Sequence, residues 1–159
     1  MKKRSFDLAR IRGVFNYQFE SENGQKMFPN DVKIEYSQNT GRIKHIYLNG
    51  SLLATLRPTN GVFALTIKGA ERLMSLKGHS RFCVRIHNDV EPFVRQGRNV
   101  FAKHIITADI KIRPGEEVVV LNNKNAVVAI GKAVLSGEEM LAFQRGVAVK
   151  VRRGIEKEK

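Results

Sequence analysis

The order of apolar and polar positions near the start of the chain predicts an amphipathic helix. Its apolar positions are separated by three, four and four residues, which places them on one stripe of a helix. The stripe consists of Leu8, Ile11, Phe15 and Phe19. Asn23 and Gly24 form a turn signal that ends the predicted helix.

Alternation with a period of two replaces the helical period between Val32 and Ile67. Four such segments, separated by turn residues, predict a small antiparallel sheet over 32–36, 42–48, 51–57 and 62–67. Asn49-Gly50 lies between the second and third segments, and because both residues accept a positive φ we expect a tight type I′ hairpin there. A second helix is predicted over 69–77, ending at Gly78.

The second half of the chain is predicted to be rich in strands. The apolar runs and turn signals predict strands over 82–86, 117–121, 126–134 and 147–153, and short helices over 99–106 and from Ser136 to Phe143. Nearly every position of 118–130 outside the loop 122–125 is apolar, so both faces of this hairpin should be covered, as in a closed barrel. In the last strand, three valines alternate with Ala148, Lys150 and Arg152, which predicts one core face and one basic face. We place the domain boundary at Gly78, which gives domains 1–78 and 79–155 and a charged tail, 156–159.

The charge of the chain indicates a polyanionic partner. Of 159 residues, 28 are Lys or Arg and 15 are Asp or Glu, which gives a net charge of +13 that is shared by both halves. Cys83 is the only cysteine, so no intramolecular disulfide can form, and its place between Phe82 and Val84 is typical of a small buried side chain. No export signal or apolar run of about 18 residues is present, so we expect a cytoplasmic protein without membrane contact.

The motifs of the second half resemble those of a PUA domain. A Pro-Gly turn, an apolar hairpin, Gly131-Lys132-Ala133, a Ser-x-Glu-Glu-Met helix and Gly146-Val147-Ala148-Val149 follow one another in the order and spacing of that family. Upstream segments, including KMFPNDVKIEYS and EPFVRQGRNVFAKHI, resemble the C-terminal part of archaeosine tRNA-guanine transglycosylases. The resemblance implies an α+β protein in which a small antiparallel sheet with helices, similar to the C2 domain of those enzymes, precedes a PUA pseudo-barrel.

The resemblance also implies which residues contact RNA. PUA domains of this kind bind the acceptor end of tRNA with their first helix, the loop before it and the final strand. Phe101 could stack on an unpaired base, although a place in the core is the more common role for such a residue. Transferred to this chain, the implied RNA-binding residues are Arg95, Gly97, Arg98, Phe101, Lys103, His104, Lys150, Arg152 and Arg153. Two further basic residues, Lys132 and Arg145, are added as candidates, with a solvated rim as their alternative role.

The chain lacks the large catalytic barrel that supplies the nucleophile and the zinc site in that family. One cysteine and four scattered histidines, His45, His79, His87 and His104, do not provide the spacing of a zinc site. The adjacent carboxylates Glu116-Glu117 and Glu138-Glu139 point in different directions on a strand or helix, and Glu139 is explained by a capping box with Ser136. We therefore expect no catalytic residue, metal or cofactor.

Three functional hypotheses remain. The first is a tRNA-binding protein without catalysis of its own, acting in tRNA modification either as a stand-alone relative or as a subunit that joins a separate catalytic transglycosylase chain. The alternative is an RNA-binding adaptor in ribosome assembly or translation, because fold alone does not fix function. A self-sufficient RNA-modifying enzyme is disfavoured by the missing nucleophile and metal ligands.

Overall fold

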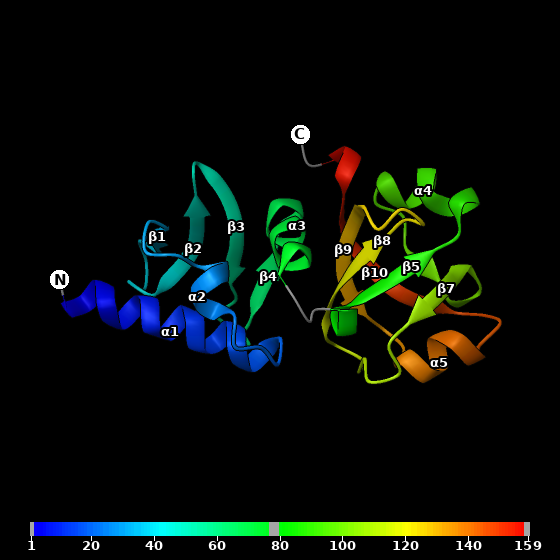
Figure 1. Cartoon of the computed structure of the whole chain (residues 1–159), viewed down its shortest axis with the longest axis horizontal. Helices are drawn as coiled ribbons and strands as arrows, with labels where there is room; N and C mark the ends of the chain where they lie inside the picture. Colours follow the sequence, from blue (N-terminus) through cyan, green and yellow to red (C-terminus); the bar gives the residue numbers. More distant parts are fainter. Residues whose placement is uncertain (1, 77–79, 158–159) are drawn as a thin grey trace. The chain divides into compact units, whose positions relative to one another are not determined.

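The computed structural model describes residues 2–76 and 80–157 and divides into two compact units, 1–79 and 80–159. Gly78, at which the sequence analysis placed the boundary, lies outside the described residues, as do Lys77 and His79. Each unit has its own sheet and its own helices (Figure 1). Of the tail proposed from the sequence, Glu156 and Lys157 belong to a short 3₁₀ turn that continues the second unit.

The first unit is a four-stranded antiparallel sheet in the order β1-β2-β3-β4, accompanied by three helices. Its strands are β1 (Lys33–Tyr36), β2 (Ile43–Leu48), β3 (Ser51–Leu56) and β4 (Phe63–Leu65). Its helices are α1 (Lys2–Gln18), α2 (Gly24–Met27) and α3 (Ile67–Ser75).

The apolar stripe predicted for the first helix is confirmed. Leu8, Ile11, Phe15 and Phe19 are all buried in the core of the first unit. The hairpin between β2 and β3 has the predicted geometry, since Asn49 and Gly50 adopt φ of 52° and 81°. Helix α3 begins two residues earlier than predicted, because the Thr66 hydroxyl accepts a hydrogen bond from the Gly69 N–H and so caps it. The short helix α2 was not predicted.

The second unit is a nearly closed six-stranded pseudo-barrel with the strand order β6-β10-β9-β8-β5-β7. Strands β5 and β8 are parallel, and the other pairs are antiparallel. The strands are β5 (Cys83–Ile86), β6 (Val100–Phe101), β7 (Ile105–Ala108), β8 (Glu117–Leu121), β9 (Val127–Ala133) and β10 (Val147–Gly154). The helices are α4 (Glu91–Arg95) and α5 (Gly137–Ala142), with 3₁₀ turns η1 (Ser80–Phe82), η2 (Asn88–Val90), η3 (Ala102–His104) and η4 (Ile155–Lys157).

The apolar β8–β9 hairpin is covered on both faces, as its composition predicted. Every residue of β8 is buried, and in β9 only Lys132 is exposed. The predicted capping box of α5 is present: the Ser136 side chain accepts from the Glu139 N–H, and the Glu139 carboxylate accepts from the Ser136 N–H. These two elements were predicted well because their signals are local.

Two predictions for the second unit were wrong. No helix covers 99–106; this segment forms β6, the η3 turn and β7, because Val100, Ala102 and Ile105 reach the core from short extended pieces. The strict alternation predicted for the last strand also fails at its start, where Ala148 and Val149 are both fully buried. Register shifts at Val147/Val149 and Val151/Arg153 interrupt the alternation, as β-bulges do.

Candidate nucleic-acid interface

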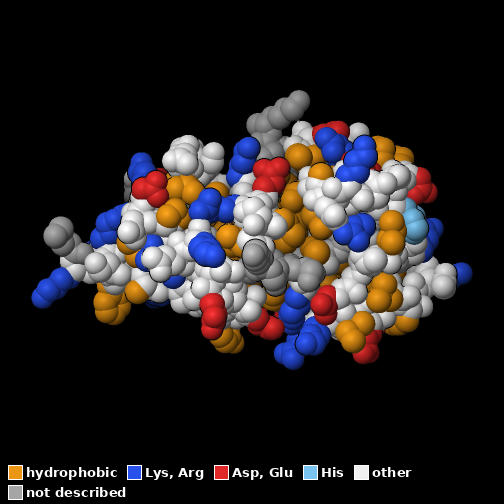
Figure 2. Space-filling view, in the orientation of Figure 1, with side chains coloured by type: hydrophobic (Ala, Val, Ile, Leu, Met, Phe, Trp, Pro, Cys, Tyr) orange, Lys and Arg blue, Asp and Glu red, His pale blue; other side chains and the backbone are white. Residues whose placement is uncertain are grey.

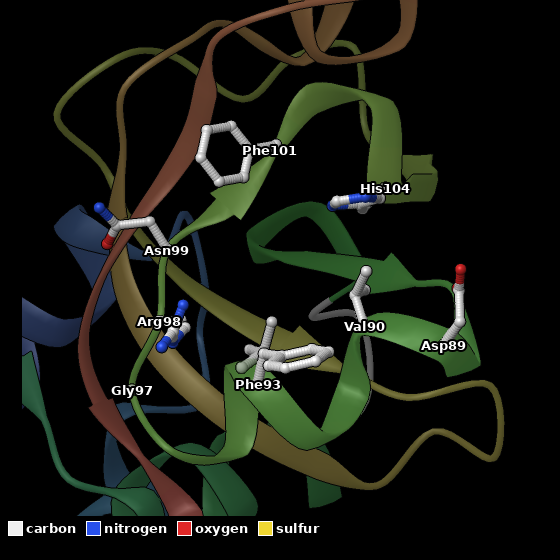
Figure 3. A pocket seen from close by; sticks show the side chains of 9 residues that line it. Asp89, Val90, Phe93, Gly97, Arg98, Asn99, Phe101 and His104 are labelled. Carbon is white, nitrogen blue, oxygen red and sulfur yellow. The ribbon is translucent and has the colours of Figure 1, made fainter.

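A pocket of about 740 Å³ opens on the second unit, between α4, the loop that follows it, β6 and η3 (Figure 3). We call it the α4–β6 pocket. Exposed aromatic side chains, one guanidinium, one imidazole and one carboxylate meet around it. The residues that line it are Asp89, Val90, Phe93, Val94, Gly97, Arg98, Asn99, Phe101 and His104.

Two adjacent apolar residues of helix α4, Phe93 and Val94, differ in their exposure. Pro92 lies in the first turn of α4, where its missing N–H costs no helical hydrogen bond. Val94 is 2% exposed and packs in the core, whereas Phe93 is 52% exposed. The Arg98 guanidinium lies 5.9 Å from the centre of the Phe93 ring, within the range of a cation–π contact.

Phe101 is on the opposite wall of the pocket, and the preference for a core position was wrong. In the two-residue strand β6, Val100 faces the core at 1% exposed, so the pleat turns Phe101 outward at 43% exposed. The His104 ring stands perpendicular to the Phe101 ring, with 6.3 Å between the ring centres. Figure 3 shows the Phe101 and Phe93 rings on opposite sides of the hollow.

The loop between α4 and β6 brings its backbone to the pocket edge. Gly97 adopts a φ of +103°, and its N–H donates to the Val94 carbonyl at 2.9 Å. The last strand supports this loop at two points. At the first point, the Asn99 Oδ1 accepts a hydrogen bond from the Val151 N–H at 2.9 Å. At the second, Gly154 packs against the backbone at the end of α4, so closely that a Cβ on Gly154 would lie 2.3 Å from the Arg95 carbonyl oxygen.

A second, smaller hollow of about 210 Å³ lies on the other side of Phe101. It is lined by Phe101, Lys103, Gln144, Arg145 and Gly146. The Ala102 N–H donates to the Gly146 carbonyl at 2.9 Å, which joins the η3 turn to the segment before β10. The structure thus brings Lys103 and Arg145, 42 positions apart in the sequence, to one hollow beside the α4–β6 pocket.

The basic residues of the sheet form a separate group. Lys132 on β9 and Lys150 on β10 are direct cross-strand partners, and both are exposed. Arg152 is not available as a simple surface cation, because its guanidinium forms a two-pronged ion pair with Glu117, whose side chain is only 6% exposed. Glu117, on β8, is itself the cross-strand partner of Lys132.

Arg95 and Arg153 lie outside both hollows. Arg95 is ion-paired with Glu91 at 3.3 Å and with Glu156 at 3.1 Å, which ties α4 to the η4 turn. Arg153 is exposed at the end of β10. Of the eleven residues predicted from the sequence, four therefore line the α4–β6 pocket, two more line the adjoining hollow, and two others are held by carboxylates.

Sequence reasoning missed five lining residues: Asp89, Val90, Phe93, Val94 and Asn99. The Glu91-Pro92 start of a helix followed by two apolar residues was a usable signal for Phe93. No local signal identified Asn99 or the supporting Gly154, because their roles depend on the approach of β10.

The described residues contain no group of three or more His, Cys, Asp or Glu side chains that could hold a metal ion. Burial raises the pKa of the Cys83 thiol, with a smaller opposing effect of Arg85, so this thiol is a poor nucleophile. Glu116 and Glu117 point to different arginines, Arg81 and Arg152. Within 2–76 and 80–157, no helix is both long enough and apolar enough to cross a membrane.

The architecture and its pocket define a two-module protein whose second module is a PUA domain. Residues 83–155 match the family described as the PUA domain, and residues 9–79 match the family described as the patch-forming domain C2 of tRNA-guanine transglycosylase. The chain therefore carries a C2-type domain followed by a PUA domain, and it resembles the C-terminal part of tRNA-guanine transglycosylases.

Curated relatives agree over nearly the whole chain. The tRNA-guanine(15) transglycosylase of Methanothermobacter thermautotrophicus is 43% identical over 148 residues, which are 93% of this chain and 23% of the relative. The enzyme of the same name from Thermococcus kodakarensis is 43% identical over 147 residues, 92% of this chain and 25% of the relative. The chain thus spans about a quarter of the length of these relatives.

Solved structures share the fold. A hypothetical protein from Pyrococcus horikoshii OT3 superposes with a TM-score of 0.72 at 24% identity, covering 93% of this chain and 89% of the other. A conserved PUA domain protein from Thermoplasma acidophilum gives a TM-score of 0.64 at 20% identity, with 90% and 89% covered.

Proposed function

We propose that this protein binds tRNA and that the α4–β6 pocket takes the unpaired 3′ end of the acceptor stem. The observation that carries the proposal is the pocket itself, where two exposed phenyl rings, Phe93 and Phe101, face a hollow that also holds Arg98 and His104. Aromatic rings and guanidinium planes of this kind stack on unpaired bases.

The chemistry of the rim supports a nucleic acid over an apolar ligand. Lys103 and Arg145 lie in the adjoining hollow, one side of which is Phe101, so a base in the larger hollow would have its phosphate near two cations. Gly97 carries no side chain at the pocket edge, so a sugar–phosphate backbone can approach the loop closely. The net charge of +13 adds a general attraction to RNA.

We infer a role in tRNA modification without catalysis by this chain, in the cytoplasm. The similarity to tRNA-guanine(15) transglycosylases supports the link to that modification. The candidate site offers groups that bind and stack, and Cys83 is a protonated, half-buried thiol. A separate chain that carries the catalytic part of a transglycosylase is the partner we propose, with this protein contributing affinity for the end of the tRNA.

The test is equilibrium binding of the full chain to tRNA with and without its 3′-terminal CCA. We expect removal of CCA to weaken binding about tenfold or more, because stacking contributes about 1–3 kcal/mol per base. Phe101→Ala should weaken binding to intact tRNA to a similar extent and should have little further effect on the trimmed tRNA.

Phe143→Ala is the matched control, because Phe143 is as exposed as Phe101, 44% against 43%, and does not line either hollow. Equal affinity for intact and trimmed tRNA would overturn the assignment of the pocket. Tighter binding to ribosomal RNA fragments than to any tRNA would instead favour the adaptor in ribosome assembly.

A further inference from the structure

One end of the α4–β6 pocket carries an acid, which is an uncommon group in a site for RNA. Asp89, in the η2 turn, is exposed, and it is the only Asp or Glu among the described residues that line the pocket. Figure 3 shows Asp89 and Arg98 on opposite sides of the Phe93 ring. A carboxylate repels the phosphates of a nucleic acid, so its place in this pocket calls for an explanation.

The local structure does not explain Asp89. Within 2–76 and 80–157, no hydrogen bond or ion pair involves its carboxylate. The N-cap residue of α4 is Val90, which has no polar side chain, and Pro92 in the first turn has no N–H that an acid could cap. Glu91, by contrast, has a structural role as an ion-pair partner of Arg95. Both oxygens of Asp89 are therefore available to a ligand in the pocket.

The charges around the pocket are divided between the two segments that form it. Residues 86–94, which lead through η2 into α4, contain two acids and no Lys or Arg. Residues 95–103, which lead from the end of α4 to η3, contain three Lys or Arg and no acid. Figure 2 shows Asp and Glu side chains interspersed with Lys and Arg on the visible face of the second unit, so the net charge alone sets no direction for an RNA. The division at the pocket does set one.

This division fits an RNA strand that ends in the pocket. The phosphates that lead up to the bound nucleotide would pass Arg98 and Lys103. A strand that continued beyond Asp89 would place its next phosphate beside two acids, with no cation from residues 86–94 to offset them. The nucleotide at the acidic end is therefore the last one of its strand.

We propose that Asp89 binds the free 2′- and 3′-hydroxyls of the terminal ribose and so restricts the pocket to RNA with an unphosphorylated 3′ end. The inference rests on the proposed function and adds the chemical group that is read. The two hydroxyls are neighbouring donors, and a carboxylate accepts a hydrogen bond on each oxygen. Acidic side chains bind ribose hydroxyls in this way in dinucleotide-binding folds. A 3′-phosphate replaces one donor with an anion, which Asp89 repels.

An exocyclic amine of a base is the other donor that Asp89 could accept from. Internal nucleotides carry this amine as well as terminal ones, and an internal nucleotide would bring its 3′-phosphate to the acidic end of the pocket. The pair of hydroxyls exists only at the 3′ end of a strand. It therefore accounts both for the acceptor at Asp89 and for the missing cations in residues 86–94.

The test is competition binding of the full chain with one tRNA prepared with three different 3′ termini after CCA. The termini are the natural diol, a 3′-phosphate and a 2′,3′-dideoxyribose. We expect the phosphate to weaken binding about tenfold or more, because it adds repulsion to the loss of a donor. The dideoxy terminus should weaken binding about fivefold to tenfold, because hydrogen bonds to a charged group are stronger than those between neutral groups.

The variant Asp89→Asn keeps the size of the side chain and removes its charge. We expect it to bind the diol several-fold more weakly than the wild type does, and to bind the diol and the 3′-phosphate within about threefold of each other. Glu138→Gln removes the same charge from an exposed acid on α5 that lines neither hollow. This control should keep the full preference for the diol.

The tRNA trimmed of its CCA separates the two possible failures. If trimmed and intact tRNA bind equally well, the assignment of the pocket and the role of Asp89 are both wrong. If trimming weakens binding but the three termini bind equally, the pocket still holds the 3′ end and only the role of Asp89 is overturned. Binding of the dideoxy terminus as tightly as the diol, or a full preference for the diol in Asp89→Asn, would also overturn that role.

Discussion

At the scale of single residues, the environment of Arg152 decides what this cation can do. Its guanidinium is held in two places by Glu117, whose side chain is almost fully buried in the sheet. Removing the acid would take a buried carboxylate away from a partly buried cation, which is more costly than losing a surface ion pair. Arg152 is therefore first a structural residue, whereas Lys132 and Lys150 remain exposed beside it.

The variant Glu117→Gln tests the structural role of the ion pair between Glu117 and Arg152. We expect it to lower the free energy of unfolding by about 1–2 kcal/mol, less than for a fully buried pair because the Arg152 side chain is 28% exposed. Urea denaturation at neutral pH provides the measurement. Glu138→Gln, which changes an exposed acid in the first turn of α5, should cost no more than about 0.5 kcal/mol; equal losses in the two variants would contradict the structural role of the pair.

At the scale of elements, the position of the α4–β6 loop depends on the end of β10. A Cβ at Gly154 would lie 2.3 Å from the Arg95 carbonyl oxygen and 2.6 Å from the Gly97 nitrogen, and both are backbone atoms that cannot rotate away. The loop that carries Gly97 and Arg98 to the pocket must then move. Gly154 is a positioning residue that touches no ligand in our proposal.

We predict that Gly154→Ala weakens tRNA binding about tenfold and lowers the free energy of unfolding by about 1–3 kcal/mol, because the loop shifts and packing is strained. Binding titrations and urea denaturation measure the two effects. Gly13→Ala is the glycine control: it lies in a helix with open space around it, so it should raise stability by about 0.5–1 kcal/mol and leave tRNA binding unchanged. Unaltered tRNA affinity in Gly154→Ala would show that the loop does not need this support.

Helix α1 is tied to the edge strand β1 by a bond that responds to alkaline pH. The hydrogen bond from the Tyr36 hydroxyl to Asp7 raises the pKa of Tyr36 above its ordinary value of 10.0, and burial adds to the effect. Since the folded state disfavours the phenolate, this contribution to stability is complete below about pH 10 and is lost as the pH rises through the folded-state pKa.

Tyr36→Phe should therefore cost about 1 kcal/mol at pH 7 and progressively less above pH 10. Thermal unfolding followed at pH 7, 9 and 11 would measure the difference between the two proteins. Tyr47→Phe, on the neighbouring strand β2, is the comparison variant. If the difference in stability between the wild type and Tyr36→Phe stayed the same at all three pH values, the role of the hydrogen bond to Asp7 would be contradicted.

At the scale of the whole molecule, the excess of positive charge predicts a strong dependence of RNA binding on salt. The logarithm of the association constant should fall linearly with the logarithm of the salt concentration, with a slope of about 0.7–0.9 per phosphate contact. The double variant Lys132→Ala/Lys150→Ala should flatten this slope by one to two contacts. The control is Lys111→Ala, which changes an exposed lysine outside both hollows and should leave the slope unchanged. Equal slopes for the wild type, the double variant and the control would show that Lys132 and Lys150 do not contact the RNA.

Several features of the fold could be predicted because their causes are local. The stripe of α1, the hairpin at Asn49-Gly50 and the capping box at Ser136 each depend on residues within a few positions of one another. The resemblance to the PUA family placed Gly97, Arg98, Phe101 and His104 among the candidates, and these four do line one pocket. The helix predicted over 99–106 failed because short apolar spacings fit a helix and a broken pair of strands equally well.

The sequence by itself determined the excess of positive charge, the two-part organisation, the strand-rich second half and the absence of a cysteine-rich metal motif. Only the tertiary structure decided which cations are available and which are held by acids, because ion pairs such as Arg152 with Glu117 join residues 35 positions apart. It also decided that Phe101 faces outward and that Gly154 supports the pocket loop. The composition gives the number of charged and aromatic side chains, but the accessibility of each side chain depends on which distant strands the fold brings beside it.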